Sequence, residues 1–131
     1  GVGGSGGNDC SYRMQEVRQG GMMQRLHYGT QIAHLDALRW ATSGGATVLR
    51  RPELGCIAVG TQADLAMFKL DELRFSGYGD PLAALVICGA HQADRVMVAG
   101  RWVVIDGQIP GLDLEQLKIN HQREAKRLKE K

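Results

Sequence analysis

Apolar and polar positions in the first part of the chain follow the period of an α-helix. After a Gly/Ser-rich stretch over residues 1–8, Asp9 or Ser11 can cap a helix that we expect to continue to about His27. The apolar stripe of this helix comprises Met14, Val17, Met22 or Met23, and Leu26. The Gly20-Gly21 pair in its middle costs about 1 kcal/mol per glycine relative to alanine, and it therefore indicates close packing against a neighbouring element.

A second helical pattern follows directly. Its apolar positions recur three residues apart at Ile32, Leu35, Leu38 and Ala41. We expect this helix to break at the glycines of residues 43–45 and to resume briefly over residues 46–49.

Beyond Pro52 the pattern changes to short runs typical of strands. We expect strand-like segments over residues 56–58 and 65–68, separated by a turn at Gly60. Two alternating segments, residues 96–98 and 103–105, flank Ala99-Gly100 and predict a β-hairpin, and Asp106-Gly107 predicts another tight turn.

Two aspartates mark helix starts in this half of the chain. Asp80 followed by Pro81 predicts a short apolar helix over residues 82–88 that ends at Gly89. Asp113 predicts the start of a final helix. The resulting order is helices, then strands, then one helix. Because the first two helices have no sheet to cover, we expect the sequence to be part of a longer chain.

Composition excludes several classes of protein. The formal net charge of +2 gives no general attraction to nucleic acid or to a membrane surface, and no segment approaches the roughly 18 consecutive apolar residues of a membrane span. The basic residues of the tail, residues 123–131, are interleaved with acidic ones, which favours a solvated helix face over an anion-binding site. Three cysteines without a CxxC spacing indicate reduced thiols in a cytoplasmic protein. Because the sequence opens on Gly rather than Met, an upstream targeting signal would not be seen.

The four histidines do not have the spacing of a metal site. His27, His34, His91 and His121 form neither an HxH nor an HExxH motif. Surface or helix-end roles are therefore favoured over metal ligation.

Six segments, in order, carry a family resemblance. They are residues 1–5 with Asn8-Asp9, then residues 16–19, 37–46, 55–65, 80–86 and 98–101. Together they resemble the amidohydrolase superfamily, in its branch of 8-oxoguanine deaminases and hydroxyatrazine ethylaminohydrolases. The resemblance extends over essentially the whole chain.

The resemblance implies an α/β fragment of a larger fold. Residues 1–50 would be the last strand-end loop and the closing helices of a metal-dependent (β/α)₈ barrel, and residues 51–112 would be the C-terminal half of a small composite β-sandwich. Residues 113–131 would form a C-terminal helix that packs back on the body. A complete barrel needs about 250 residues, so this chain would supply only its end.

The resemblance also implies hydrolytic deamination of a nitrogen heterocycle, at a carbon–nitrogen bond other than a peptide bond. In the longer parent protein, zinc or iron would be held by upstream histidines and by an aspartate at the end of the last barrel strand. That aspartate falls on Gly3, which has no side chain to bind a metal or move a proton. We therefore expect no intact catalytic residue and no metal in this chain, and no activity from the chain alone.

The opening loop supplies the candidates for a substrate pocket, which are Gly4, Ser5, Asn8 and Cys10. Their alternative roles are loop shaping and, for Asn8 and Asp9, helix capping. The parent would bind a small heterocyclic substrate, without nucleic acid or membrane partners, and whether it is a homo-oligomer stays open.

Two other classes of function compete with the enzyme fragment. A non-catalytic, amidohydrolase-like scaffold would explain Gly3 as the loss of the metal site. A free-standing β-rich interaction module is disfavoured by the amphipathic helices that have nothing to cover.

Overall fold

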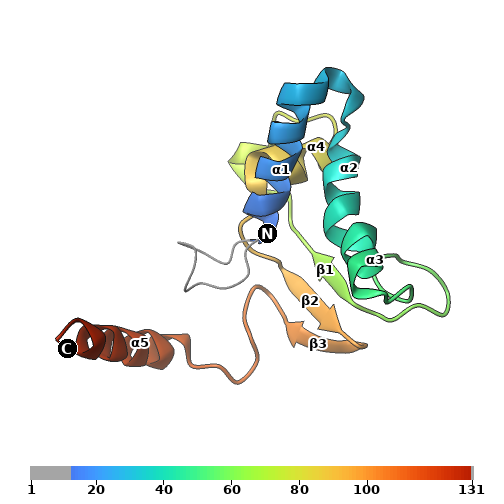
Figure 1. Cartoon of the computed structure of the whole chain (residues 1–131). Coiled ribbons are helices and arrows are strands. Elements are labelled where there is room, and N and C mark those ends of the chain that lie inside the picture. Colours follow the sequence, from blue (N-terminus) through green and yellow to red (C-terminus); the bar gives the residue numbers. More distant parts are fainter. Residues whose placement is uncertain (1–12, 131) are drawn as a thin grey trace.

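The computed structural model describes residues 13–130 and places a group of helices at one end of a small antiparallel sheet (Figure 1). The helices are α1 (Arg13–Tyr28), α2 (His34–Arg39), α3 (Gly45–Leu49), α4 (Pro81–Ala83) and α5 (Leu114–Lys129). The strands are β1 (Leu65–Met67), β2 (Arg95–Val98) and β3 (Arg101–Val104). Short 3₁₀ turns cover Gly29–Gln31 and Leu73–Phe75, and π-helical turns cover Trp40–Gly44 and Ala84–Gly89.

Close packing in the middle of α1 is confirmed at one of its two glycines. Gly21 is buried, and a Cβ atom built on it would lie 3.1 Å from the Cβ of Ala37 in α2. Gly20 has open space around it, so the same expectation is wrong there. The α1–α2 contact therefore depends on one small residue in each helix.

The sequence pattern predicts that the second helix breaks at its glycines, and this prediction is wrong. The helix continues from α2 through the π-helical turn Trp40–Gly44 into α3. The hydroxyls of Thr42, Ser43 and Thr47 donate to the carbonyls of Leu38 at 2.8 Å, Arg39 at 3.3 Å and Ser43 at 2.9 Å. These bonds to the residue four positions earlier occupy carbonyl groups in a stretch where the regular α-helical ladder is interrupted.

Residues 56–58 do not form the expected strand. The Thr61 hydroxyl lies 3.2 Å from the amide nitrogen of Ala58 and 2.7 Å from its carbonyl oxygen, which folds this segment into a turn. Just before the turn, Gly55 has a φ of +76° and passes close to the π-helical turn. A Cβ on Gly55 would lie only 2.6 Å from the carbonyl oxygen of Thr42.

The sheet has the order β1-β2-β3 with antiparallel pairing throughout. Leu65 of β1 is paired with Met97, and Val96 of β2 is paired with Val104. The predicted hairpin is confirmed, because Ala99 and Gly100 both have positive φ, at 48° and 79°, as a two-residue type I′ turn requires. The turn predicted at Asp106-Gly107 is also confirmed, with φ values of 50° and 73° and a bridge between Ile105 and Gln108.

The core beside the sheet is small. Asp80 accepts a hydrogen bond from the Leu82 amide at 2.9 Å, which confirms the predicted cap, and Pro81 opens α4. The helix then widens into the second π-helical turn and ends at Gly89. The buried centre of this core consists of Phe75, Ala84 and Ala90. The partly buried residues that pack against it are Phe68, Leu70, Leu85 and Cys88.

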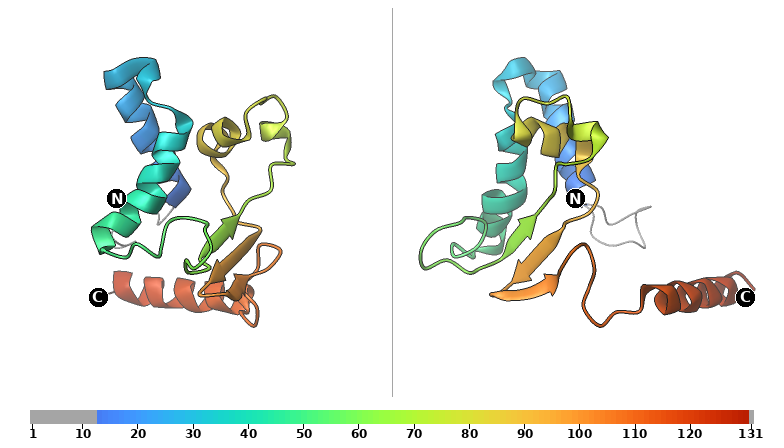
Figure 2. Two further views of the ribbon diagram at one scale, coloured as in Figure 1. Left: turned by 90° about the vertical axis from the view of Figure 1, so that its right-hand side faces the viewer. Right: turned by 180° about the vertical axis from the view of Figure 1, so that it is seen from behind.

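The last helix begins where Asp113 predicts, because the Asp113 carboxylate accepts from the Gln116 amide at 2.9 Å. No residue of α5 is buried, and the helix extends away from the sheet (Figures 1 and 2). The helix is thus not covered by the described residues, and its expected packing on the body of a longer protein stays a prediction.

The close approach at Gly55 leads to a stability prediction. Gly55→Ala should destabilise the fold by about 1–3 kcal/mol or more, because it adds both left-handed backbone strain and a clash with the Thr42 carbonyl. Gly60→Ala is the matched control, since Gly60 has a φ of +87° but open space around it. Urea denaturation followed by tryptophan fluorescence at low protein concentration measures both changes. Equal losses in the two variants would show that the clash contributes nothing.

Candidate functional site

The residues predicted to form the substrate pocket lie outside the described part of the chain. These are Gly4, Ser5, Asn8 and Cys10, together with Gly3 at the position of the family aspartate. The first described residue after this loop is Arg13, which opens α1. We therefore build the candidate site from the first turns of α1.

A hollow of about 830 Å³ lies between α1 and the π-helical turn, and we call it the α1 hollow. Arg13 and Glu16 are three residues apart on α1, so both side chains belong to one helix face. The lining residues are Arg13, Glu16, Val17, Gln19, Gly20, Met23, Ala37, Trp40, Ala41 and Gly45. Its lining is largely apolar, with a few polar groups.

The chemistry of the α1 hollow suits recognition more than bond cleavage. Trp40 offers an indole surface, and Arg13, Glu16 and Gln19 add charged and amide groups. An aromatic wall with a few polar groups is typical of sites that hold a flat ring. Among the described residues, the hollow contains no arranged pair of nucleophile and base.

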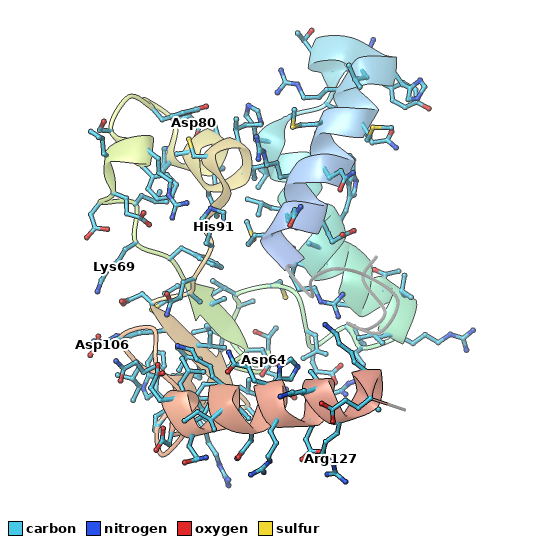
Figure 3. The ribbon with its side chains drawn as sticks, turned by 90° about the vertical axis from the view of Figure 1, so that its left-hand side faces the viewer. Asp64, Lys69, Asp80, His91, Asp106 and Arg127 are labelled. Carbon is cyan, nitrogen blue, oxygen red and sulfur yellow. The ribbon has the colours of Figure 1, made fainter. Side chains whose placement is uncertain are left out.

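The four histidines come from four separate segments. His27 lies near the end of α1 beside the Tyr28 ring, and His34 opens α2. His91 lies in the loop before β2 (Figure 3), and His121 is within the range of α5. Across residues 13–130, His, Cys, Asp and Glu side chains nowhere gather into a group of three that could hold a metal ion.

Asp64 has a structural task at the sheet. Its carboxylate accepts from the Ala99 amide at 2.7 Å and from the Gln62 side-chain amide at 2.9 and 3.0 Å. The hydrogen bond from Ala99 is the main cause that lowers the pKa of Asp64, and the bond from Gln62 adds to it. The carboxylate thereby joins the start of β1 to the hairpin turn, where Ala99 is held at positive φ.

A second polar cluster lies at the other end of the strands, where Figure 3 places Lys69 and Asp106 on one side of the sheet. Lys69 Nζ lies 2.6 Å from Asp94 Oδ1, and this hydrogen bond raises the pKa of Lys69. Arg95 lies 3.7 Å from Asp106, and Gln92 donates to the Gly107 carbonyl at 2.6 Å. Both carboxylates are paired with cations, which indicates a structural role for this cluster.

The sequence pattern does not mark Arg13 or Trp40 as site residues. Trp40 lies at the start of the π-helical turn, and a π-turn is a frequent feature of functional sites. The sequence signal that could have indicated this π-helical turn is Thr42-Ser43 followed by Gly44-Gly45 inside a helical pattern. The sequence analysis interpreted that signal as a break in the helix.

Comparison with known proteins gives a consistent picture. Residues 3–103 match the profile of the amidohydrolase family. The chain is 54% identical over 129 residues to an 8-oxoguanine deaminase of Pseudomonas aeruginosa, a match that covers 98% of this chain and 29% of that protein. It is 34% identical over 123 residues to a hydroxydechloroatrazine ethylaminohydrolase of Pseudomonas sp. (strain ADP), which covers 89% of this chain and 26% of that protein.

Solved structures share the fold. A zinc-bound adenosine deaminase from Xanthomonas campestris superposes with a TM-score of 0.82 at 27% identity, covering 90% of this chain and 28% of that one. A triazine hydrolase variant superposes with a TM-score of 0.82 at 30% identity, covering 92% and 27%. Because α5 begins at residue 114 of 131, a match over 92% of the chain includes part of that helix.

The chain spans between a quarter and three tenths of the length of these relatives. Within residues 13–130, no helix has both the length and the apolar character required to cross a membrane.

The hydrogen bond from Ala99 to Asp64 leads to a pH-dependent prediction. Because folding lowers the pKa of Asp64, its carboxylate stabilises the fold above the unfolded value of 3.8, and this contribution is lost as the pH falls through the lower folded value. Asp64→Asn should therefore lower the urea midpoint at neutral pH, and the deficit should shrink in strong acid. Asp71→Asn, at an exposed position after β1, is the control. A deficit that does not change with pH would contradict the assignment.

Proposed function

The chain belongs to the amidohydrolase family, and we propose that it is the C-terminal part of a metal-dependent enzyme that hydrolytically deaminates a nitrogen heterocycle. The substrate would be similar to 8-oxoguanine or a hydroxytriazine. The observation that carries the proposal is the 54% identity to an 8-oxoguanine deaminase over nearly the whole of this chain. The likeness to a zinc-bound deaminase structure at a TM-score of 0.82 supports it.

Exposed apolar residues support the proposal that further chain covers these elements. Val48 and Leu49 on α3 are 84% and 67% exposed, although both are large apolar residues of a helix that normally would face a partner. In our proposal, α1–α3 close a barrel and the three-stranded sheet is half of a composite sandwich. Such a sheet would gain further strands from a remote part of the longer protein.

The described residues do not fit a catalytic metal, since residues 13–130 lack a suitable group of ligands. We propose that zinc or iron in the longer protein is held by residues outside this part of the chain. Zinc is named in the structures of the Xanthomonas deaminase and of an atrazine chlorohydrolase from Arthrobacter aurescens. The latter superposes with a TM-score of 0.73 at 28% identity, covering 84% of this chain and 25% of that one.

Gly3 favours a second candidate function. The position at which the resemblance implies a metal-binding and proton-transferring aspartate carries no side chain. A scaffold that keeps the fold but has lost the metal site would explain this residue. Replacing Gly3 by aspartate distinguishes the two candidates.

Metal analysis tests the chain by itself. After dialysis, the isolated chain should retain no stoichiometric zinc or iron, because a tight structural or catalytic site needs three or four arranged ligands. Inductively coupled plasma mass spectrometry provides the measurement. One tightly held metal ion per chain, released on substitution of any histidine, would reveal a site formed with residues outside the described range.

A chimera tests the enzymatic proposal directly. The segment of the Pseudomonas aeruginosa 8-oxoguanine deaminase that matches this chain is replaced by this chain, with Gly3 or with Gly3→Asp. Gly3→Asp should raise ammonia release by about 10²- to 10⁴-fold, because general acid–base catalysis typically contributes that much. It should also increase the retained metal. The substrate panel comprises 8-oxoguanine, guanine, cytosine and a hydroxytriazine.

A matched control separates the effect of position 3 from that of an added charge. Gly77→Asp introduces the same side chain at a glycine with open space around it, and it should leave both rate and metal content unchanged. If Gly3→Asp changes neither rate nor metal content, the alignment of the opening loop is wrong. If metal content rises without activity, the scaffold is favoured.

A further inference from the structure

A second hollow lies at the opposite end of α1 from Arg13, and we call it the Arg25 hollow. It has a volume of about 440 Å³ and is formed by four separate parts of the chain. Its lining residues are Met22, Arg25 and Leu26 from α1, His34 from α2, Tyr78 from the loop before α4, and Ile87 from the second π-helical turn. Neither the sequence analysis nor the proposed function uses this hollow.

The contact between Arg25 and His34 has an informative geometry. Arg25 Nη1 lies 3.1 Å from Nε2 and 3.4 Å from Nδ1 of the imidazole. Both distances are within hydrogen-bonding range, and the tautomer of the imidazole determines which nitrogen can accept from Nη1. This contact engages Nη1 of Arg25. The Nε and Nη2 groups of the planar guanidinium can therefore donate to a ligand.

No carboxylate of the described residues neutralises this guanidinium. Arg25 has no ion pair within residues 13–130. The acidic side chain nearest in sequence to His34 is Asp36, whose oxygens accept from the Ala33 amide at 2.8 Å and pair with Arg39 at 3.6 Å. A partly buried arginine usually has an acidic partner, so its absence here leaves the hollow electropositive.

Tyr78 adds a neutral phenol to the lining, with its hydroxyl hydrogen-bonded to Cys88. Its hydrogen bond with Cys88 is the main cause that raises the pKa of Tyr78, and desolvation adds to this effect. The phenol therefore stays protonated at neutral pH. The positive charge of Arg18 acts on Tyr78 as well and lowers its pKa, against the larger raising effects. Arg18 therefore adds positive potential near Tyr78.

The remaining wall is apolar, and this decides the class of ligand. Met22, Leu26 and Ile87 provide thioether and aliphatic surface beside the cationic side. An inorganic anion would use the cationic side alone, whereas an organic carboxylate would use both sides. We propose that the Arg25 hollow binds a small organic carboxylate, with Arg25 pairing with the carboxylate and with an apolar or aromatic body against Met22, Leu26 and Ile87.

The proposal is tested on the full chain, captured at low density so that self-association does not interfere. Surface plasmon resonance measures the binding of benzoate, of neutral benzamide with nearly the same shape, and of inorganic phosphate. Benzoate should bind at least about tenfold more tightly than benzamide, because charge-assisted hydrogen bonds to a carboxylate are stronger than those to a neutral amide. Benzoate should also bind more tightly than phosphate.

Variants assign the interaction to residues. Arg25→Gln should weaken benzoate binding by at least about tenfold, and Arg25→Lys should restore part of it through charge without the planar fork. His34→Gln should have a smaller effect, because the ring supports the guanidinium. Arg123→Gln, at an exposed arginine on α5, is the control and should leave binding unchanged.

Three outcomes would overturn the proposal. Equal binding of benzoate and benzamide would show that Arg25 does not recognise the charge, and phosphate binding as tight as benzoate would exclude an organic ligand class. Benzoate binding that survives in an Arg25→Gln variant with an unchanged circular dichroism spectrum would place the ligand elsewhere. If Arg25→Gln alone fails to fold, the affinity of Arg25→Lys decides: unchanged affinity overturns the proposal and reduced affinity supports it.

Discussion

Close approach of helix backbones through small side chains is the constraint on which this fold depends. The fully buried positions of the helical part are mostly alanine and glycine, with Gly21 against Ala37 as the tightest contact. Bulky side chains contribute little to the interior, where Phe75 and Val86 are the large buried residues within the described chain. Small residues let helices pack tightly but bury little apolar area. The stability of these elements therefore depends strongly on backbone geometry and on whatever covers their exposed faces.

Sequence reasoning succeeded where structure is determined locally. Asp80-Pro81, Ala99-Gly100 and Asp113 each contain within two to four residues the hydrogen-bonding or backbone preference that produces a cap or a turn. It failed where contacts between distant segments decide. Residues 56–58 are apolar enough for a strand, but the Thr61 hydroxyl and the approach of Gly55 to Thr42 fold them into a turn. The α1 hollow likewise needs two helices and a π-turn, which no single motif predicts.

The two hollows on α1 differ in what surrounds them. The α1 hollow is lined by an acidic and a basic side chain of the same helix, Glu16 and Arg13. The Arg25 hollow is lined by Arg25 and, among the described residues, by no acidic side chain. The polar clusters of the sheet, in contrast, are internally neutralised by Lys69–Asp94 and Arg95–Asp106. Among the described residues, the Arg25 hollow thus has a cation without an acidic partner, whereas the charges beside the strands are paired.

The π-helical turn Trp40–Gly44 changes the rotational phase of the helix that contains it. In a regular α-helix the separation of nine positions between Ala37 and Ala46 corresponds to about two and a half turns, which would point these alanines in opposite directions. A π-helical turn contains more residues per rotation than an α-helical turn, so the helix rotates less between the two alanines. Both alanines are buried, although a regular helical period would place one of them in solvent. A single amphipathic period therefore cannot describe this helix. The segments before and after the turn keep separate phases, and each can face a different neighbour.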